Sequence, residues 1–455
     1  MEISGNFNPI SAQRARDLLG VSAITDSINN IINVNILPDL ADAKKRLDTG
    51  GQPITYYGAK PWFDGDAIVD SQPAIMTALN AGPYPDRAEL NIPRGDFRVE
   101  TEIYNTKSVS IFGKGKQHSR FISRTPGLIV FSQNTRGETS TIPYARTFSC
   151  KHMSFMVDGY GPGCALDIRQ DGTYAGFQME DVEFNSFNGS YNWKDKFMRL
   201  QGVVGGVISR CKGPGGAYND KNSLSQCTPI GVHIYSQDNT NKVYGVTFND
   251  CQFAAVVNAV LCQIDGVVGD SGTIEGIVMR DCFMRSCLGA AFRQYVPRSY
   301  GMWKAPLYIF DGTNTEGPGS SMDIDSATDV YITKGWFVQG PTYDGSSRPL
   351  LHFGHVDDVH ITNSKLIAFD DAKLSCFLAM DSGIPRADGS NGGVTRAVIR
   401  DLIIDPAIPR QGANGATFDS ATAIGNIPDI KFYEPTYTKW IDGKTKYIGT
   451  SPNRT

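Results

Sequence analysis

VYGVTFNDCQF (243–253) and IEGIVMRDCFM (274–284) are two copies of a pattern that this chain repeats. Each copy has a short stretch of alternating apolar and polar residues, a polar turn and a second short stretch of the same kind. Val246 and Ile277 are 31 residues apart, and Val330 and Val359 in two later copies are 29 apart. These are one-turn lengths for a three-faced parallel β-helix, so we predict an all-β solenoid. The other copies are FQMEDVEFNSF (177–187), ATDVYITKGWF (327–337), VDDVHITNSKL (356–366) and VTRAVIRDLII (394–404).

In this register Cys251 aligns with Cys282, and Asp250 aligns with Asp281. The alignment predicts an interior ladder of small apolar thiols and a stack of aspartates at a turn. The chain has nine cysteines, with no CxxC pair among those in strand-like sequence. We therefore expect buried free thiols, formed in a reducing cytoplasm.

Charge and composition favour a turn-rich β protein. Lys and Arg total 43, Asp and Glu total 47, and the formal net charge is −4, with no basic or acidic tail. Nucleic acid and anionic membranes are therefore not indicated as partners. The first residues lack a signal-peptide pattern, and the longest apolar stretch, near FAAVVNAVLC (253–262), is too short for a membrane span. We expect no membrane insertion, and no export through a signal peptide.

YYGAKPWFDGDAIVDSQPAIMTALNAG (56–82) predicts a helix near residues 70–81. Asp70 or Ser71 can cap this helix, and Ile75, Met76 and Leu79 lie on one of its faces. A β-helix has an open end, and a helix laid across that end would cover the exposed interior. We therefore expect the aspartates of this stretch to shape a loop and cap a helix, outside the chemistry.

Four segments follow one another in an order that resembles the start of the pectate-lyase-like superfamily of right-handed β-helices. Arg94 and Phe97 replace the usual Pro and Tyr of that pattern, and Pro61 and Trp62 enlarge the loop after YYGAK. The resemblance implies the fold and leaves the reaction open. The segments are YYGAK (56–60), FDGDAIVDSQPAIMTALNAG (63–82), AELNIPRGDFRVETEI (88–103) and VSIFGKGKQHSRF (109–121).

Residues 1–50 are predicted to form a separate, helical segment, in which Ile24, Ile28 and Ile31 have helical spacing. Such a stripe suits a helix that packs against copies of itself or one that folds against the body. Joined to a β-helix over 51–410, this segment resembles the attachment part of bacteriophage tailspikes and tail-borne depolymerases. That resemblance implies a homotrimer in the virion tail, which docks to a tail or baseplate protein through residues 1–50 and binds a bacterial surface polysaccharide. We interpret residues 411–455 as a terminal cap that helps trimer closure.

The resemblance also implies an endo-glycosidase, since such proteins usually cut the polysaccharide that they bind. Hydrolysis of a glycosidic bond needs a proton donor and a second carboxylate. Glu316 resembles a glutamate found after a polar turn in polysaccharide-cutting members, although Thr315 replaces the usual aromatic residue. We predict Glu316 as the catalytic acid, with Asp281 or Asp311 as its partner, and a loop with Asp265, Asp270 and Glu275 as the alternative source.

Two further groups could take part. If Ile324 points inward, Asp323 and Asp325 both point outward, about 7 Å apart, within the spread expected of an inverting pair. One loop earlier, FRQYVPRSYGMWKAP (292–306) gathers aromatic and cationic residues that suit a sugar-binding surface. From this insertion we predict substrate contacts by Arg293, Tyr300, Trp303 and Lys304.

HFGHVDDVH (352–360) is the one metal-like cluster, with His352, His355 and His360 beside Asp357 and Asp358. We favour exposed turn histidines over a metal site here, and we expect no cofactor. Two other functions stay open: a non-enzymatic receptor-binding or adaptor protein of the tail, and a polysaccharide lyase.

Overall fold

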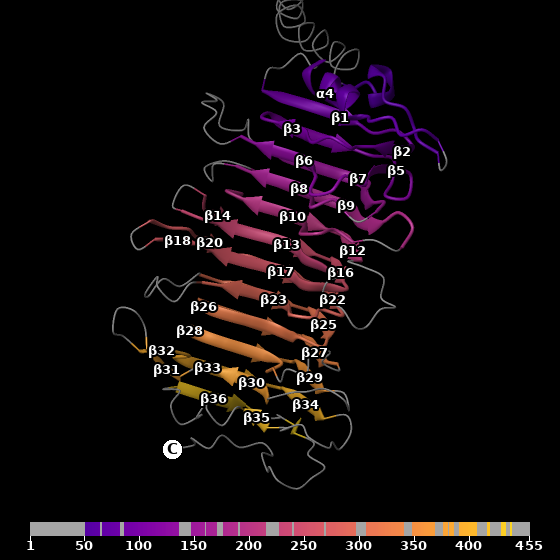
Figure 1. Ribbon diagram of the computed structural model, residues 1–455. Coiled ribbons are helices and arrows are strands. Elements are labelled where there is room, and N and C mark those ends of the chain that lie inside the picture. The colour runs from indigo at the N-terminus through magenta and orange to yellow at the C-terminus, as the bar shows by residue number, and fades with distance from the viewer. Residues whose placement is uncertain are drawn as a thin grey trace, which may run out of the picture.

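The strands coil into a right-handed parallel β-helix, as predicted, in which three sheets run along the molecule (Figure 1). Most strands pair in parallel with the strand one coil earlier and the strand one coil later. Within the part described, no helix is long and apolar enough to cross a bilayer. The computed structural model describes residues 51–63, 66–81, 86–135, 147–159, 161–170, 176–189, 192–214, 227–238, 241–267, 270–296, 306–340, 348–368, 376–380, 382–385, 391–406, 416–418, 429–433 and 437–438.

The sheet that faces the viewer in Figure 1 is called sheet one. It comprises β3 (Ile103–Asn105), β6 (Ile129–Asn134), β8 (Cys164–Arg169), β10 (Lys196–Gln201), β13 (Thr228–Ser236), β17 (Val256–Ile264), β23 (Ala290–Tyr295), the first parts of β26 (Ser320–Thr333) and β28 (Leu351–Thr362), β30 (Cys376–Met380) and β35 (Ala416–Phe418).

Sheets two and three complete each coil. Sheet two comprises β1 (Arg87–Asn91), β4 (Ser108–Phe112), the first parts of β7 (Phe148–Val157) and β9 (Phe177–Ser186), β11 (Val207–Ser209), β15 (Thr247–Asn249), β21 (Ile277–Arg280), β24 (Tyr308–Asp311), the last parts of β26 and β28, β33 (Arg396–Arg400) and β36 (Asp429–Tyr433). Sheet three comprises β2 (Gly95–Arg98), β5 (Ser119–Ser123), the last parts of β7 and β9, β12 (Lys212–Pro214), β16 (Gln252–Ala254), β22 (Phe283–Arg285), β25 (Asn314–Gly317), β27 (Trp336–Gln339), β29 (Lys365–Ala368), β34 (Ile403–Pro406) and β37 (Tyr437–Thr438).

Short pairs lie outside these three sheets, namely β14 (Val243–Tyr244) with β20 (Ile274–Glu275), β18 (Gly266–Val267) with β19 (Asp270–Ser271), and β31 (Ser382–Pro385) with β32 (Asn391–Gly393). Parallel pairing continues beyond residue 410, where we expected the β-helix to end, since β36 pairs with β33 and β37 with β34. The predicted N-terminal segment, residues 1–50, lies outside the described residues.

The predicted register is confirmed: Thr247 pairs with Val278 and Val330 pairs with Val359. The turn between sheets two and three adopts the left-handed region in several coils, among them those of Asp250, Asp281 and Asn363, where φ is 49°, 51° and 48°. Asp and Asn tolerate this region better than most residues because their short side chains bond locally. The predicted stack of aspartates is therefore a ladder of turn residues.

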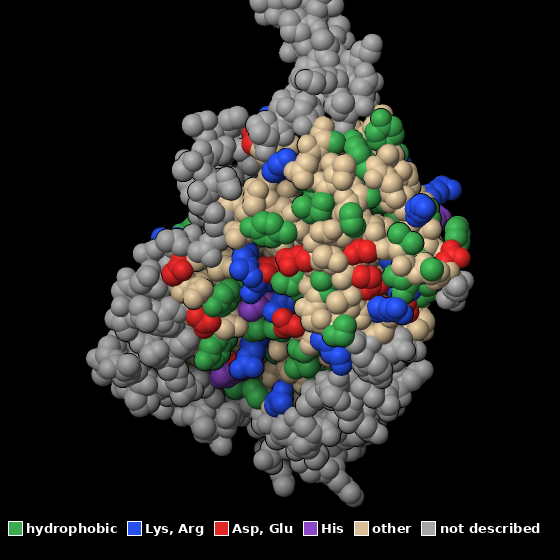
Figure 2. Space-filling view, turned by 45° about the horizontal axis from the view of Figure 1, so that its top comes forward, with side chains coloured by type: hydrophobic (Ala, Val, Ile, Leu, Met, Phe, Trp, Pro, Cys, Tyr) green, Lys and Arg blue, Asp and Glu red, His purple; other side chains and the backbone are tan. Residues whose placement is uncertain are grey.

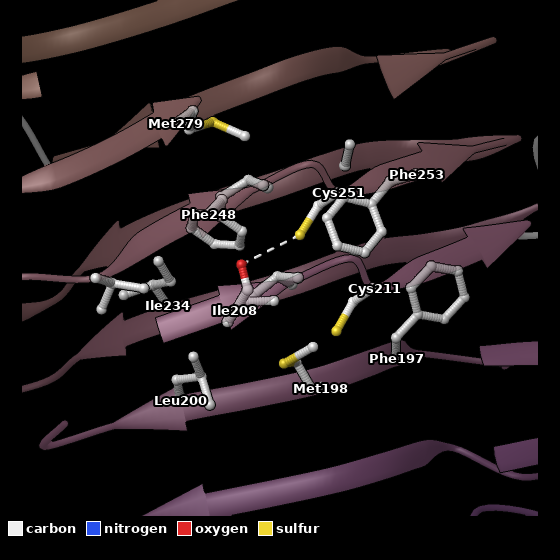
Figure 3. Close-up of a cluster of buried hydrophobic side chains, with 14 of the residues drawn as sticks. Phe197, Met198, Leu200, Ile208, Cys211, Ile234, Phe248, Cys251, Phe253 and Met279 are labelled. Atoms are coloured by element: carbon white, nitrogen blue, oxygen red, sulfur yellow. Dashed lines mark hydrogen bonds between the residues drawn. The ribbon is translucent and has the colours of Figure 1, made fainter. Parts of the chain in front are cut away.

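The interior is a set of stacked apolar columns (Figure 3). Ile208, Phe248 and Met279 occupy one register position on β11, β15 and β21, and all three are fully buried. Cys251 lies beside them, and its Sγ donates to the carbonyl of Ile208 at 3.3 Å. The eight cysteines whose side chains are described are free, and all but Cys227 are buried, which confirms an interior role for them. The side chain of Cys376 lies outside the described residues.

Helix α4 (Gln72–Ala81) lies over the β1 end of the solenoid (Figure 1). The Asp70 Oδ1 atom accepts from the backbone amides of Gln72, at 3.0 Å, and Glu100, at 3.1 Å. This carboxylate therefore caps the helix and ties it to the first coil. Ile75 and Leu79 are buried and Met76 packs at the edge, as predicted.

The enlarged loop after YYGAK is anchored by Trp62, which is buried. The guanidinium carbon of Arg98 lies 3.7 Å from the centroid of the Trp62 ring, and the ring of Phe187 packs edge-on at 5.6 Å. Arg98 also forms an ion pair with Asp158. The departure from the family pattern thus adds a cation–π contact that joins the loop to the coils below it.

Candidate active site on sheet one

The outward side chains of sheet one form a polar band on the surface of the solenoid. Because neighbours along a strand point to opposite faces, residues paired in register form columns across the sheet. Figure 2 shows Lys, Arg, Asp, Glu and His side chains gathered in a band along the middle of the described surface. One such column, the outer column, consists of Asp167, Arg199, His233, Leu261, Arg293, Asp323 and His352, on β8, β10, β13, β17, β23, β26 and β28.

Strand β26 presents two carboxyl groups on this face. Ile324 is fully buried, while Asp323 and Asp325 on either side of it are partly exposed, which confirms the predicted alternation. Residues two positions apart along a strand are separated by about 7 Å. The aspartates are therefore close enough to act on one sugar and far enough apart to admit a water.

Asp323 is held between two nitrogen-bearing side chains from neighbouring coils. The His352 Nδ1 atom lies 2.7 Å from one carboxylate oxygen of Asp323, and the Arg293 Nε atom lies 3.6 Å from the other. Burial alone would raise the pKa of Asp323, but the hydrogen bond and the charges of His352 and Arg293 outweigh it and lower this pKa. Asp323 is therefore an anion near neutral pH.

Asp325 is in the opposite situation. The backbone amide of Val296 donates a hydrogen bond to its Oδ2 atom at 3.2 Å. Burial, and then the negative charge of Asp323, raise the pKa of Asp325 to about 6. In mildly acidic solution, below a pH of about 6, Asp325 therefore keeps its proton while Asp323 is ionised, which is the arrangement that general acid–base chemistry requires.

Of the predicted substrate-binding residues, Arg293 lies at this site. Tyr300, Trp303 and Lys304 follow β23 in the sequence and lie outside the described residues. Tyr295, the last residue of β23, is 38% exposed. An exposed aromatic side chain beside Asp323 and Asp325 suits the C–H face of a sugar ring.

The predicted catalytic residues Glu316, Asp311 and Asp281 lie elsewhere, around the turn between sheets two and three. Glu316 pairs with Arg285, with Nε and Oε2 3.5 Å apart, and Asp311 pairs with Lys334, with Nζ and Oδ1 3.7 Å apart. The Asp281 amide donates to the Asp311 carbonyl at 2.9 Å, so these two residues are neighbours. The structure does not bring this group to Asp323, and its catalytic role stays a prediction.

Two of the alternative loop residues, Asp265 and Glu275, have different surroundings. Asp265 accepts from the Gln263 side-chain amide at 2.8 Å, and Glu275 lies on β20, where burial raises its pKa. The side chain of Asp270 is not described.

The three histidines of the metal-like cluster serve different neighbours along β28, which is one continuous strand. His352 contacts Asp323, the ring of His360 stacks on Tyr331 at 4.7 Å, and His355 bonds the backbone of Gly393. Among the described residues, no group of three His, Cys, Asp or Glu side chains could hold a metal ion.

His352 was missed as a partner of Asp323, although the repeat length contains the signal. His352 follows Asp323 by 29 residues, the same spacing that separates Val330 from Val359. The register that aligned the apolar residues could therefore also have aligned these two polar residues.

No family model and no curated protein matches the chain. Among solved structures, ORF18 of Geobacillus virus E2 is 14% identical over 88% of this chain and 64% of its own, with a TM-score of 0.45. The A-module of mannuronan C-5 epimerase AlgE6 from Azotobacter vinelandii is 10% identical over 84% of this chain and 100% of its own, with a TM-score of 0.49. The gp42 tailspike of Acinetobacter phage vb_AbaP_AS12 is 10% identical over 88% of this chain and 67% of its own, with a TM-score of 0.42. This chain thus spans just under two thirds of ORF18, and its structural neighbours include phage proteins and a glycan-modifying enzyme.

Proposed function

We propose that this protein is a phage tailspike that binds a bacterial surface polysaccharide along sheet one and hydrolyses its glycosidic bonds. The observation that carries the proposal is the pair Asp323 and Asp325, whose surroundings push their pKa values in opposite directions. The same proposal includes a homotrimer in the virion tail that docks to a tail protein through residues 1–50.

The chemistry assigns one role to each carboxyl group. Asp325 protonates the oxygen that leaves from the scissile bond, since it still carries its proton in mildly acidic solution. Asp323 takes a proton from a water that attacks the anomeric carbon from the opposite face. Their spacing of about 7 Å leaves room for that water, so the product has inverted configuration.

Arg293 and His352 act through Asp323. Both hold it as the anion, and His352 fixes the orientation of its carboxylate by the 2.7 Å contact. They are positioning residues, and Tyr295 supplies a surface for the sugar ring.

The test uses purified protein, a panel of bacterial capsule and O-chain polysaccharides, and an assay of new reducing ends. We expect Asp325→Asn and Asp323→Asn each to lower the rate by a factor of about 100 or more, with binding retained. The matched control is Asp329→Asn, which changes a carboxyl group of the same strand at the sheet-two end of β26. Full activity in Asp325→Asn would refute the assigned acid.

A second candidate centre is the group of Glu316, Asp311 and Asp281. Its Asp281–Asp311 backbone contact places two carboxyl-bearing residues in adjacent coils. Glu316→Gln in the same assay separates the two centres, because only one of the two families of variants can abolish product release.

The same samples address the other functions. A lyase would release unsaturated products that absorb in the ultraviolet, and Arg293 beside Tyr295 offers a cation and a phenol for such an elimination. A receptor-binding protein without activity would bind a polysaccharide of the panel and release no product from it.

A further inference from the structure

A second polar cluster lies on sheet one, remote from Asp323. The carboxylate of Asp167 is almost fully buried, with its side chain 3% exposed, and it holds two guanidinium groups. Arg169 Nη2 donates to it at 2.8 Å and Arg199 Nε donates at 2.8 Å. We call Asp167, Arg169 and Arg199 the arginine cluster.

The arginine cluster carries an uncompensated positive charge at the surface. Two cations share one carboxylate, and the adjacent Lys196 and Asp195 form their own ion pair. The side chains of Arg169 and Arg199 are 38% and 22% exposed, so each guanidinium group keeps part of its surface in contact with solvent. Burial would raise the pKa of Asp167, but hydrogen bonds from Arg199 and Arg169 overcome this and lower it, so the cluster keeps its charges across the usual pH range.

A buried, neutral histidine and partly exposed polar side chains lie on the next coils of sheet one. His233 is 8% exposed, and burial lowers its pKa to about 4, so its ring is uncharged. This ring lies 5.3 Å from the ring of Tyr235 and 3.1 Å, through Nε2, from the Gln263 amide oxygen. The Nδ1 atom of His233 has no hydrogen-bond partner within the described part of the protein. Beyond Gln263, Asp265 offers an acceptor for sugar hydroxyls.

The register fixes where this surface lies relative to the proposed catalytic pair. Arg199 and Asp323 belong to the same outer column, four strand spacings apart, which is about 19 Å. His233, Leu261 and Arg293 occupy the positions between them. A polysaccharide that lies along the solenoid axis would therefore reach both places at once.

We propose that the arginine cluster is a subsite for an anionic sugar, one that bears a carboxylate or a phosphate. This inference rests on the proposed function, since it assigns the substrate class of the same surface. Forked donors that are held in place by a buried carboxylate lose little freedom when they bind an anion, and arginine matches carboxylate and phosphate groups bidentately.

The experiment measures binding of the full chain to the polysaccharide panel in the Asp325→Asn background, where the proposed function expects cleavage to be about 100-fold slower or more. We expect the bound polysaccharides to be acidic and their affinity to fall with added salt. Arg199→Gln should weaken binding about ten-fold or more, as expected for loss of hydrogen bonds to a charged group. Arg199→Lys, which keeps the charge and the burial of Asp167 but loses the fork, should give an intermediate loss.

The matched control is Arg210→Gln, because Arg210 pairs with Glu180 at the turn between sheets two and three and is more exposed. Two chemical treatments of the bound polysaccharide distinguish the sources of charge: reduction of its carboxyl groups to alcohols, or removal of its phosphate groups. Loss of binding after one of them identifies the anion. Unchanged binding after both, or equal binding by Arg199→Gln and the parent, would overturn the subsite.

The outcome is separable from that of the proposed function. Charge-dependent binding without product release in the parent protein would retain the subsite and reject the hydrolase. Release of reducing ends from a neutral polysaccharide would retain the hydrolase and reject the subsite.

Discussion

Asp323 and Asp325 are the same amino acid at equivalent outward positions, and only their neighbours make them different. Asp323 faces His352 and Arg293, whereas Asp325 faces a backbone amide and the charge of Asp323. The alternation of the strand alone predicted their common direction. The difference in ionisation could not be predicted from the sequence, because it comes from residues about 30 positions away that only the register brings close.

This difference predicts a pH profile for cleavage. Activity should fall as pH rises through about 6, because the proton of Asp325 is lost there. On the acid side it should persist below the ordinary aspartate range, because the pKa of Asp323 is lowered. Initial rates, measured at a fixed low substrate concentration from about pH 3 to about pH 8, would trace the profile. This range extends from below the ordinary aspartate pKa to above neutrality. An optimum in the alkaline range would contradict the assignment.

Asp325 should also lower the stability of the protein in neutral solution. Its folded pKa, about 6, is above the unfolded value, so the folded state is most stable where Asp325 is protonated and loses stability as pH rises from about 4 to about 6. Asp325→Asn removes this loss, so we expect the free energy of unfolding to rise by an amount on the order of 1–2 kcal/mol at neutral pH. Thermal unfolding of both proteins at mildly acidic and neutral pH would measure it. A gain of equal size at both pH values would show that ionisation is not its cause.

At the scale of single elements, the turn between sheets two and three recurs along the described part of the solenoid. It was predicted from the recurring polar pair in VYGVTFNDCQF and IEGIVMRDCFM, since local chemistry suffices to mark a turn. It was harder to predict which outward side chains become neighbours across coils, because loops of unequal length separate the strands. Arg199, for example, lies 32 residues after Asp167 and 34 before His233.

The left-handed backbone of this turn gives a prediction for Asn363, which is exposed and has φ of 48°. Asn363→Val should cost about 1–2 kcal/mol, because a β-branched side chain clashes with the backbone in this region. Asn363→Gly should be neutral or slightly stabilising, since glycine adopts positive φ freely. Chemical denaturation measures both. The control is Thr362→Val at the preceding, extended position, where valine is well tolerated, and a comparable loss there would attribute the effect to valine itself.

At the scale of the whole molecule, each coil is covered only by its neighbours, so the first coil depends on α4. Both the helix and its capping role were predicted from residues 56–82, because the helical spacing of Ile75 and Leu79 is local. The cation–π contact of Arg98 with Trp62 was not predicted, since the two residues lie 36 positions apart and outside any repeat. Stability at this end therefore combines one contact that the sequence pattern indicates and one that only the fold creates.

Leu79→Asp tests how far the loss of this cover spreads. Leu79 is 2% exposed on the face of α4 that packs against the solenoid, so a buried charge there should detach the helix, at a cost of at least about 3 kcal/mol. Because coupling in a solenoid passes between adjacent coils, amide hydrogen exchange should accelerate first in β1 to β5 and leave β17 to β28 protected. Thr77→Asp, on the exposed face of the same helix, is the control and should leave exchange unchanged. Uniform acceleration along all coils would instead mean that the β-helix unfolds as one cooperative unit.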